Sequence, residues 1–313
     1  MENMHLIDLH CDTLYKSVEN NVSFVDESLE LNFDNNMNRL QCYAIWIPDD
    51  LNGDEAEQLF DVAYARLKQQ CKENNINLLH DLSQSRKLIY DNKNTAIFTI
   101  ENSMALNGKI ENVKRFADCN VKMMTLTWNA HNDVGDGSAV DNATGITQFG
   151  KDVVKEMENN NIIVDISHAS DKLFYDVAQI AKRPFVASHS NSRAVTNHKR
   201  NLTDEQFKII LDCDGIVGIN FHNEFLNNNL KKAKMIDILR HVEHFLELGG
   251  ENSICFGSDF DGGTLPKDIK GSSSLQQIYE MFLKHKYSES IINKIFYENA
   301  LKFFENFDNQ RIM

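Results

Sequence analysis

The sequence predicts an α/β fold, a closed (β/α)8 barrel of the TIM type, and two observations predict it. Short runs rich in Ile, Val and Phe alternate with longer stretches of helical period, the pattern of repeated βα units. Eight such runs can be counted, and eight strands close this barrel. Because the chain has only three prolines, 14 glycines and no Gly/Ser-rich or Pro-rich linker, we expect a single barrel domain over residues 1–313.

The expected strands are the short apolar runs, whose length and β-branched content favour a strand over a helix. They lie at 6–12, 41–47, 95–101, 122–128, 162–168, 185–189, 216–221 and 254–259. Amphipathic stretches at 54–74, 147–159, 203–211 and 234–248 are expected to form helices between them. Thr203 and Gln206 stand three residues apart at the start of one stretch, the spacing of a capping box.

Five of these strands end in residues that can bind metals: His10 and Asp12, Glu101, His168, His189 and Asp259. Side chains alternate between the two faces of a strand, so His10 and Asp12 are expected to point the same way. The carboxyl ends of all strands in a parallel barrel meet at one mouth. We therefore expect these residues, which are far apart in the sequence, to lie together.

The chemistry of this residue set indicates a metal centre. Close carboxylates repel one another and would take up protons unless cations neutralise them. Nitrogen and oxygen ligands without thiolate suit Zn2+, with Mn2+, Fe2+ and Co2+ as alternatives. Glu101, on a strand between the two groups of ligands, is the expected bridge between a pair of divalent ions. Each strand ending alone is common in ordinary loops, and it is the five together that predict the site.

Composition excludes other classes of protein. Lys and Arg number 32 against 46 Asp and Glu, a formal net charge of -14, which argues against nucleic-acid binding. Six cysteines without a CxxC pair indicate free thiols in a reducing compartment. No run is long and apolar enough for a bilayer, and the first residues do not have the pattern of a signal peptide. We expect a cytoplasmic protein without membrane or nucleic-acid partners.

Several segments resemble the signature segments of the renal (membrane) dipeptidase family of zinc metallopeptidases. They are LIDLHCDTL at 6–14, VDISHAS at 164–170, FVASHS at 185–190, RNLTD at 200–204 and FGSDFDG at 256–262. The resemblance spans nearly the whole chain, in the family's order. It implies a barrel of the metal-dependent hydrolase type with two zinc ions, in which the ligands are His10 and Asp12 for one ion, His168 and His189 for the other, and Glu101 as the bridge.

The same resemblance implies roles for two further residues. Arg200 stands where the family binds substrate with an arginine, whose planar fork suits a terminal carboxylate. A purely loop-stabilising role for Arg200 is the alternative. Asp259 is the expected proton shuttle between the attacking water and the leaving amine, with a role as an extra metal ligand left open. Asp261 is interpreted as a turn residue.

The resemblance therefore implies hydrolysis of unblocked dipeptides by a hydroxide that bridges the two ions. Whether a D-residue is accepted at the C-terminal position stays open, and a homodimer is implied by resemblance alone. The sequence departs from the animal members at Trp128, where they carry a histidine that is thought to steady the tetrahedral intermediate. Trp128 is expected to contact substrate. His131 could replace the missing histidine from the loop, although a surface position is favoured.

Three other functions are weighed. A related barrel enzyme could cleave a lactone, a cyclic amide or a phosphoester with the same metals. A catalytically impaired metal-binding homologue is suggested by Trp128. A nucleotide-binding enzyme is disfavoured because neither GxGxxG nor GxxxxGK[ST] occurs.

Overall fold

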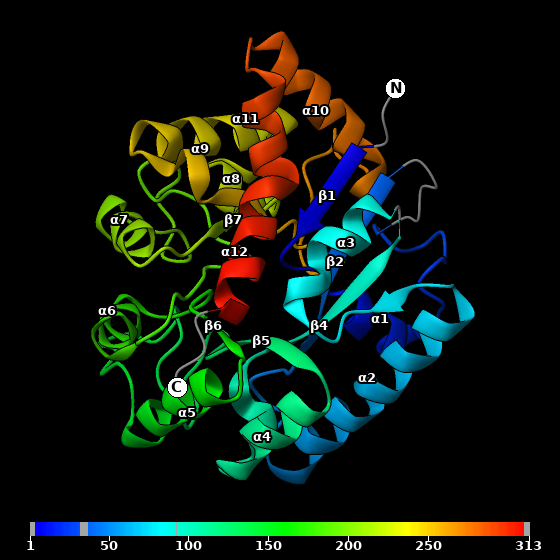
Figure 1. Ribbon diagram of the computed structural model, residues 1–313. Coiled ribbons are helices and arrows are strands. Elements are labelled where there is room, and N and C mark those ends of the chain that lie inside the picture. The colour runs from blue at the N-terminus through cyan, green and yellow to red at the C-terminus, as the bar shows by residue number, and fades with distance from the viewer. Residues whose placement is uncertain (1–3, 32–36, 92, 310–313) are drawn as a thin grey trace.

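A parallel β-sheet forms the centre of the molecule, and helices surround it (Figure 1). The computed structural model describes residues 4–31, 37–91 and 93–309, so both ends of the predicted domain fall outside the described residues. The strands are β1 (Met4–Asp8), β2 (Met37–Trp46), β3 (Asn77–Leu78), β4 (Thr95–Glu101), β5 (Val121–Thr125), β6 (Ile163–Asp165), β7 (Val217–Ile219) and β8 (Ile254–Phe256).

The sheet closes on itself. Neighbouring strands follow the order β6-β5-β4-β2-β1-β8-β7, and the short β3 pairs with β4 off this path. The segment 185–189 joins the two ends of the series, because Val186 forms a parallel bridge with Asp165 of β6 and Ala187 one with Val217 of β7. The amide of Ile166 donates to the carbonyl of Val186 at 2.8 Å across this junction. The fold is therefore the predicted (β/α)8 barrel.

The strands are shorter than predicted at their carboxyl ends. β4 ends at Glu101 as expected, whereas β1 ends at Asp8 and β8 at Phe256. The expected strand at 185–189 forms isolated bridges alone, and β3 was not expected. A set of the predicted site residues therefore lies in the loops that follow the strands: His10, Asp12, Trp128, His168, His189 and Asp259.

Backbone conformation explains part of this difference. His168 and Asp259 have φ angles of 67° and 63°, in the left-handed region, which no strand residue adopts. Asp12 is the N-cap residue of the first helix. The expectation that His10 and Asp12 share one face of a strand is wrong, because β1 has ended before both.

The helices are α1 (Thr13–Asn20), α2 (Gly53–Glu73), α3 (Ser85–Tyr90), α4 (Glu111–Asp118), α5 (Gln148–Asn159), α6 (Asp171–Ile180), α7 (Asp204–Asp212), α8 (Asn223–Leu226), α9 (Met235–Glu247), α10 (Leu275–Lys284), α11 (Glu289–Asn293) and α12 (Asn299–Asn309). The four predicted helices correspond to α2, α5, α7 and α9, within one residue at each end. The capping box of Thr203 and Gln206 is confirmed.

Aromatic side chains attach the helices to the barrel. Phe60 of α2 packs against Phe98 of β4 and Phe116 of α4, with ring centroids 5.5 and 4.3 Å apart. Phe296, in the π-helical turn between α11 and α12, packs against Phe256 of β8 at 4.8 Å. Each such fully buried ring contributes about 2–3 kcal/mol of transfer free energy. Among the described residues, no helix combines the length and apolar character required of a membrane span.

Candidate metal centre

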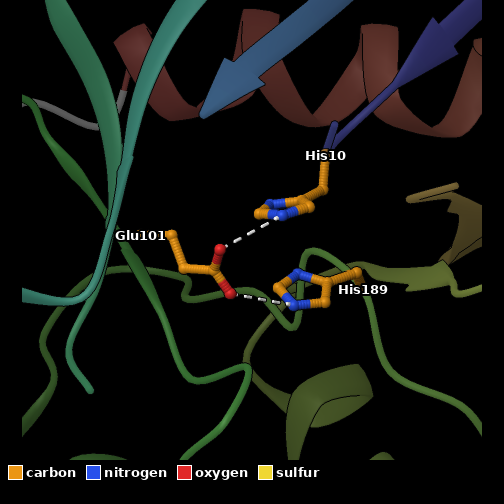
Figure 2. A group of neighbouring side chains, drawn as sticks. All are labelled: His10, Glu101 and His189. Carbon is orange, nitrogen blue, oxygen red and sulfur yellow. Dashed lines mark ion pairs between the residues drawn. The ribbon is translucent and has the colours of Figure 1, made fainter. Parts of the chain in front are cut away.

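Glu101 lies at the barrel mouth, and both His10 and His189 face its carboxylate (Figure 2). Its Oε2 is 3.6 Å from Nε2 of His10, and its Oε1 is 2.9 Å from Nε2 of His168. Oε1 is also 3.6 Å from Nε2 of His189. The two carboxylate oxygens thus face different ligand groups, which is the arrangement that a bridging ligand requires.

Two compact groups of potential ligand atoms share His10. Nε2 of His10 is 3.4 Å from Oδ2 of Asp12 and 3.9 Å from Oδ1 of Asp259. The atoms of His10, Glu101 and His189 lie within 4.8 Å of one another, and so do those of His10, Asp12 and Asp259. His168 adjoins the first group, with its Nε2 3.0 Å from that of His189. The structure brings all the predicted ligands together.

Local contacts orient these ligands. The amide of His10 donates to Oδ1 of Asp8 at 3.2 Å, which fixes the backbone just after β1. Nδ1 of His168 lies 2.9 Å from Oδ1 of Asn129, so this nitrogen carries the proton and Nε2 keeps its lone pair. Nδ1 of His189 lies 2.7 Å from Oγ of Ser188. Both imidazoles turn Nε2 toward Glu101 while Nδ1 has an oxygen partner, and metal-ligating histidines have the same arrangement of their second ring nitrogen.

Burial controls the charges at this mouth. Desolvation holds the pKa of His168 and of His189 well below the usual value, so both rings are neutral. Desolvation together with the charges of Asp12 and Asp259 raises the pKa of Glu101 well above its usual value. Desolvation, opposed by His10, raises the pKa of Asp259 to about 7. His10 differs, because the carboxylates of Glu101 and Asp12 outweigh its desolvation and raise its pKa to about 10. Two neutral imidazoles and a cluster of carboxyl groups that are costly to ionise together form a donor set for cations.

The unpaired atoms at the mouth fit the same interpretation. Nε2 of His10 and Oδ1 of Asp12 are buried without a hydrogen-bond partner among the described residues. Buried polar atoms normally have partners, and both residues belong to a group of carboxylate and imidazole ligands whose atoms lie within 4.8 Å of one another. The nitrogen and oxygen donors, with no thiolate among them, suit a borderline divalent ion. The residues present therefore fit the predicted divalent metal ions.

A cavity of about 300 Å3 opens over this centre. Trp128 lines it, with its ring 5.0 Å from that of Trp46 and 5.9 Å from that of His168. Tyr15 extends the aromatic wall, 4.9 Å from Trp46. The remaining lining residues are Asp12, Lys16, Glu101, Asn129, His168, His222, Glu224, Phe225, Asp259, Asp261 and Gly262. The cavity joins a polar floor to an aromatic wall.

Arg200 lies behind this cavity and is almost fully buried. It lines a small recess, about 10 Å3, that also adjoins His168. Its Nη2 donates to the carbonyl of His189 at 3.2 Å, and its Nε has no partner among the described residues. Burial lowers the pKa of Arg200 to about 10, against the attraction of Asp259 and Glu101. The guanidinium is a buried cation beside the metal centre.

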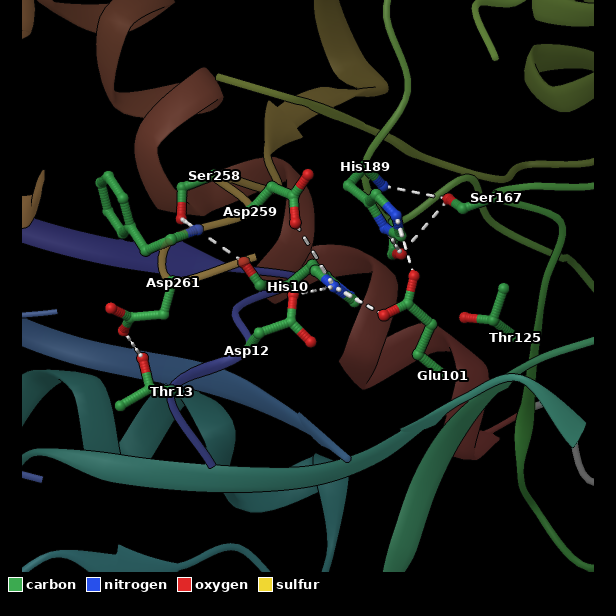
Figure 3. Close-up of polar contacts among 12 residues, drawn as sticks. His10, Asp12, Thr13, Glu101, Thr125, Ser167, His189, Ser258, Asp259 and Asp261 are labelled. Atoms are coloured by element: carbon green, nitrogen blue, oxygen red, sulfur yellow. Dashed lines mark hydrogen bonds and ion pairs between the residues drawn. The ribbon is translucent and has the colours of Figure 1, made fainter. Parts of the chain in front are cut away.

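Two predicted alternatives occupy structural positions. His131 has a side chain that is 61% exposed, lies 2.7 Å from Oδ1 of Asp136, and does not line the cavity. The expectation that His131 could replace the histidine absent at position 128 is therefore wrong in this geometry, and the surface position is confirmed. Asp261 has a φ of 68° and accepts hydrogen bonds from Thr13 and the amide of Glu30, which agrees with a turn residue (Figure 3).

Some residues of the site were not anticipated from the sequence. Asn220 donates from Nδ2 to Oδ2 of Asp259, and His222 lines the cavity. Both follow β7, and their position at the end of the predicted strand 216–221 was a usable signal. Trp46, the last residue of β2, carried the same signal. Tyr15 lies on α1, and nothing in the local sequence indicated that this helix borders the mouth.

Comparisons with known proteins agree with this geometry. The family model described as "Membrane dipeptidase (Peptidase family M19)" matches residues 1–311. The "uncharacterized protein in pqqA 5'region" of Klebsiella pneumoniae is 31% identical over 216 residues, which cover 66% of this chain and 80% of that protein.

Solved structures share the fold over nearly the whole chain. The dipeptidase AC, a metallopeptidase of family M19, aligns with a TM-score of 0.87 and 26% identity over 97% of this chain and 98% of its own. A metallopeptidase from Rhodobacter sphaeroides, liganded with a phosphinate mimic of L-Ala-D-Ala, aligns with a TM-score of 0.85 and 24% identity over 97% and 99%. The family match and these likenesses lead to one conclusion: the chain belongs to the membrane dipeptidase family of metallopeptidases, peptidase family M19.

Proposed function

We propose that this metallopeptidase hydrolyses unblocked dipeptides with two divalent ions, zinc in the first instance. The observation that carries the proposal is Glu101, whose two oxygens face His10 on one side and His168 on the other. Asp12 and His189 complete the two ligand sets. Bound there, the ions would polarise the scissile carbonyl and lower the pKa of a water molecule between them.

We assign proton transfer to Asp259. Its Oδ1 lies 3.9 Å from Nε2 of His10, and its Oδ2 accepts a hydrogen bond from Nδ2 of Asn220 at 2.9 Å. Asp259 also lines the cavity, so its carboxyl group borders the space in which a substrate would lie. A carboxylate there can accept a proton from the attacking water and return it to the leaving amine.

The substrate is proposed to lie between a cation and the aromatic wall. Arg200, a buried guanidinium with an unpartnered Nε and with Asp259 and Glu101 as neighbouring charges, is the proposed partner of the free carboxylate. Trp128 and Trp46 are the proposed apolar contacts. A cavity of about 300 Å3 suits a dipeptide, and a third residue would collide with the groups that bind the termini.

The stereochemistry of the C-terminal residue is a further part of the proposal. The Rhodobacter sphaeroides metallopeptidase is liganded with a mimic of L-Ala-D-Ala, a dipeptide with a D-residue at its C-terminus. We propose that this chain accepts D-residues at that position, because a carboxylate anchor constrains the terminal group more than the side chain beside it.

One experiment tests the proposal directly. Purified protein is analysed for metal content and assayed against L-Ala-L-Ala, L-Ala-D-Ala, their N-acetylated and C-amidated forms, and Ala-Ala-Ala. We expect two equivalents of divalent metal and hydrolysis of the free dipeptides alone, lost with a chelator and restored by Zn2+. Protein loaded with metal that cleaves a lactone or phosphoester but no dipeptide, or that turns over nothing, would reject the assignment.

The compartment, the domain organisation and the oligomeric state of the enzyme are also proposals. All six cysteines are free, which supports a reducing, cytoplasmic compartment. We further propose that residues 1–313 form one catalytic domain and that the protein is a homodimer. Light scattering coupled to size-exclusion chromatography would measure the mass in solution, and limited proteolysis would test for separate domains.

A further inference from the structure

A buried hydroxyl and a buried carboxylate stand behind His189. Asp165, the last residue of β6, is fully buried and accepts four hydrogen bonds. The amides of Ser167 and Ser188 each donate to its Oδ1 at 2.9 Å. Its Oδ2 accepts from Oγ of Ser188 at 2.5 Å and from Oγ1 of Thr125 at 2.7 Å. Four donors thus converge on one buried carboxyl group.

The positions of the protons follow from these contacts. Ser188 has a single hydroxyl proton, and it donates that proton to Oδ2 of Asp165. Oγ of Ser188 must therefore accept at its second short contact, 2.7 Å from Nδ1 of His189. Nδ1 then carries the ring proton, and Nε2 presents a lone pair toward Glu101, 3.6 Å away.

The backbone of His189 is held by the same cluster. Its amide donates to Oγ of Ser167 at 3.1 Å, and Oγ of Ser167 lies 3.3 Å from Oγ of Ser188 (Figure 3). The ring and the main chain of His189 are therefore both anchored to the end of β6. This matters because a ligand's orientation, and with it the affinity for the metal, depends on the partner of the second ring nitrogen.

We propose that Ser188, whose hydroxyl is oriented by Asp165, is a positioning residue for the metal centre and fixes the tautomer and orientation of His189. This inference rests on the proposed function, since it assumes that His189 binds a metal ion. Ser188 touches neither substrate nor metal in this arrangement. Its contribution is to supply an acceptor for Nδ1, an acceptor that is itself polarised by the carboxylate of Asp165.

The barrel contains a second serine whose hydroxyl donates to a buried aspartate, and this second pair supplies a matched control. At the end of β1, Asp8 accepts from the amide of Ser258 at 2.9 Å and from its Oγ at 2.5 Å. The next residue after Ser258 is Asp259, as His189 follows Ser188. However, the remaining contacts of the Ser258 hydroxyl are to backbone atoms, the carbonyl of His10 and the amide of Phe260, both at 3.4 Å.

The test compares Ser188→Ala with Ser258→Ala, using Co2+ as the probe. Metal-free protein is titrated with Co2+ against a chromophoric chelator, and the visible absorption of the bound Co2+ is recorded. We expect Ser188→Ala to weaken binding of at least one ion about 10- to 100-fold and to change the absorption band. Ser258→Ala should weaken Co2+ binding much less and keep the wild-type spectrum, because the Ser258 hydroxyl contacts the backbone of His10 and not a ring nitrogen of a ligand.

Two further measurements separate positioning from general stability. Each alanine variant loses one hydroxyl-to-carboxylate hydrogen bond, so the metal-free Tm values should fall by similar amounts. Ser188→Cys keeps the outline of the side chain with a poorer acceptor, and we expect intermediate Co2+ affinity. This variant also serves if Ser188→Ala does not fold.

The outcomes distinguish this inference from the proposed function. If wild-type protein binds no Co2+, the metal centre fails and the inference fails with it. If the wild type binds Co2+ and the Ser188 variants match it in affinity and spectrum, the inference alone is overturned. Equal losses in Ser188→Ala and Ser258→Ala would also overturn it, because the effect would then be a general loosening of the barrel mouth.

Discussion

Asn220 donates a hydrogen bond from Nδ2 to Oδ2 of Asp259 at 2.9 Å, and so fixes the carboxylate that borders the metal centre. Asn220 is itself held by Asn191, which accepts from the Asn220 amide and donates to its carbonyl, both at 2.9 Å. The carboxylate of Asp259 is thus supported from the segment just after the neighbouring strand β7, although Asp259 has a left-handed backbone.

We expect Asn220→Ala to lower kcat roughly tenfold with KM changed less than about twofold, because the proton carrier loses its orientation while substrate contacts remain. Steady-state kinetics with a free dipeptide measure both constants, and metal analysis confirms that the ions are retained. An unchanged kcat would show that the support of Asp259 by Asn220 has no part in catalysis.

Glu101→Gln should remove the bridge between the two ligand sets. An amide offers one oxygen acceptor and two N–H donors, and the donors would face His10 or His168 instead of a metal ion. We expect loss of at least one ion and a fall in kcat of roughly 100-fold or more. The Tm of the metal-free protein should rise, because burial raises the pKa of Glu101 and penalises its charge.

A surface glutamate is the control for that substitution. Glu57 pairs with Lys109 at 2.8 Å, on the outside of the barrel. Glu57→Gln should leave the metal content unchanged. Full metal occupancy in Glu101→Gln, measured by elemental analysis, would contradict the bridging role.

Substitutions at Trp128 and His131 should distinguish a residue of the cavity wall from a residue outside the cavity. Trp128 lines the cavity against Trp46, so Trp128→Ala is expected to raise KM about five- to tenfold through lost apolar contact. His131 faces solvent beside Asp136, so His131→Ala should keep kcat and KM within about twofold. A large fall in kcat for His131→Ala would show that the loop rearranges around the substrate.

His241 should make the stability depend on pH. Its Nδ1 accepts from the amide of Ser192 at 3.1 Å, and Nε2 lies 3.1 Å from the carbonyl of Leu226. Burial lowers its pKa to about 4. Between pH 4 and about 6.5 the unfolded chain binds more protons than the folded one, so the stability contribution is complete above pH 6.5 and is lost as the pH falls toward 4.

The measurement is urea unfolding of His241→Gln and wild type at pH 7.5 and pH 5. The wild type should lose roughly 2 kcal/mol more than the variant over this interval, because glutamine takes up no proton. His285→Gln, at an exposed position, should keep the wild-type dependence. Equal losses for the wild type and the His241 variant would mean that the ring is not held neutral by burial.

Much of the fold could be read from local patterns. The helix that follows Thr203 begins where its capping box predicts, because capping is a contact between residues three apart. β4 ends at Glu101 as expected. Most of the other strands lie where they were predicted, but the predicted ranges extend too far at the carboxyl end. A strand ends where its backbone pairing with the neighbouring strand stops, either because that neighbour ends or because a side chain at the strand end takes over the hydrogen bonds. For β1 and β6 those side chains are Asp8 and Asp165, which bind serines distant in the sequence.

The location of Arg200 illustrates what local patterns could not supply. Arg200 stands eleven residues after His189, which suggests that the two residues lie close together but does not say where the guanidinium points. In the structure its guanidinium reaches back to the carbonyl of His189 and lies behind the cavity. Whether a side chain lines a cavity or supports its wall depends on the path of a loop, and that path is decided by packing across the barrel.

Local sequence patterns were sufficient to predict the barrel class, the family resemblance and the types of ligand residue, because apolar runs and the polar residues after them are local features of the chain. Tertiary structure alone decided which oxygen of Glu101 faces which histidine, that Asn220 supports Asp259, and that Ser188 lies between Asp165 and His189. These are contacts between segments separated by tens to hundreds of residues. Strand order and register bring such segments together, and no local pattern encodes them.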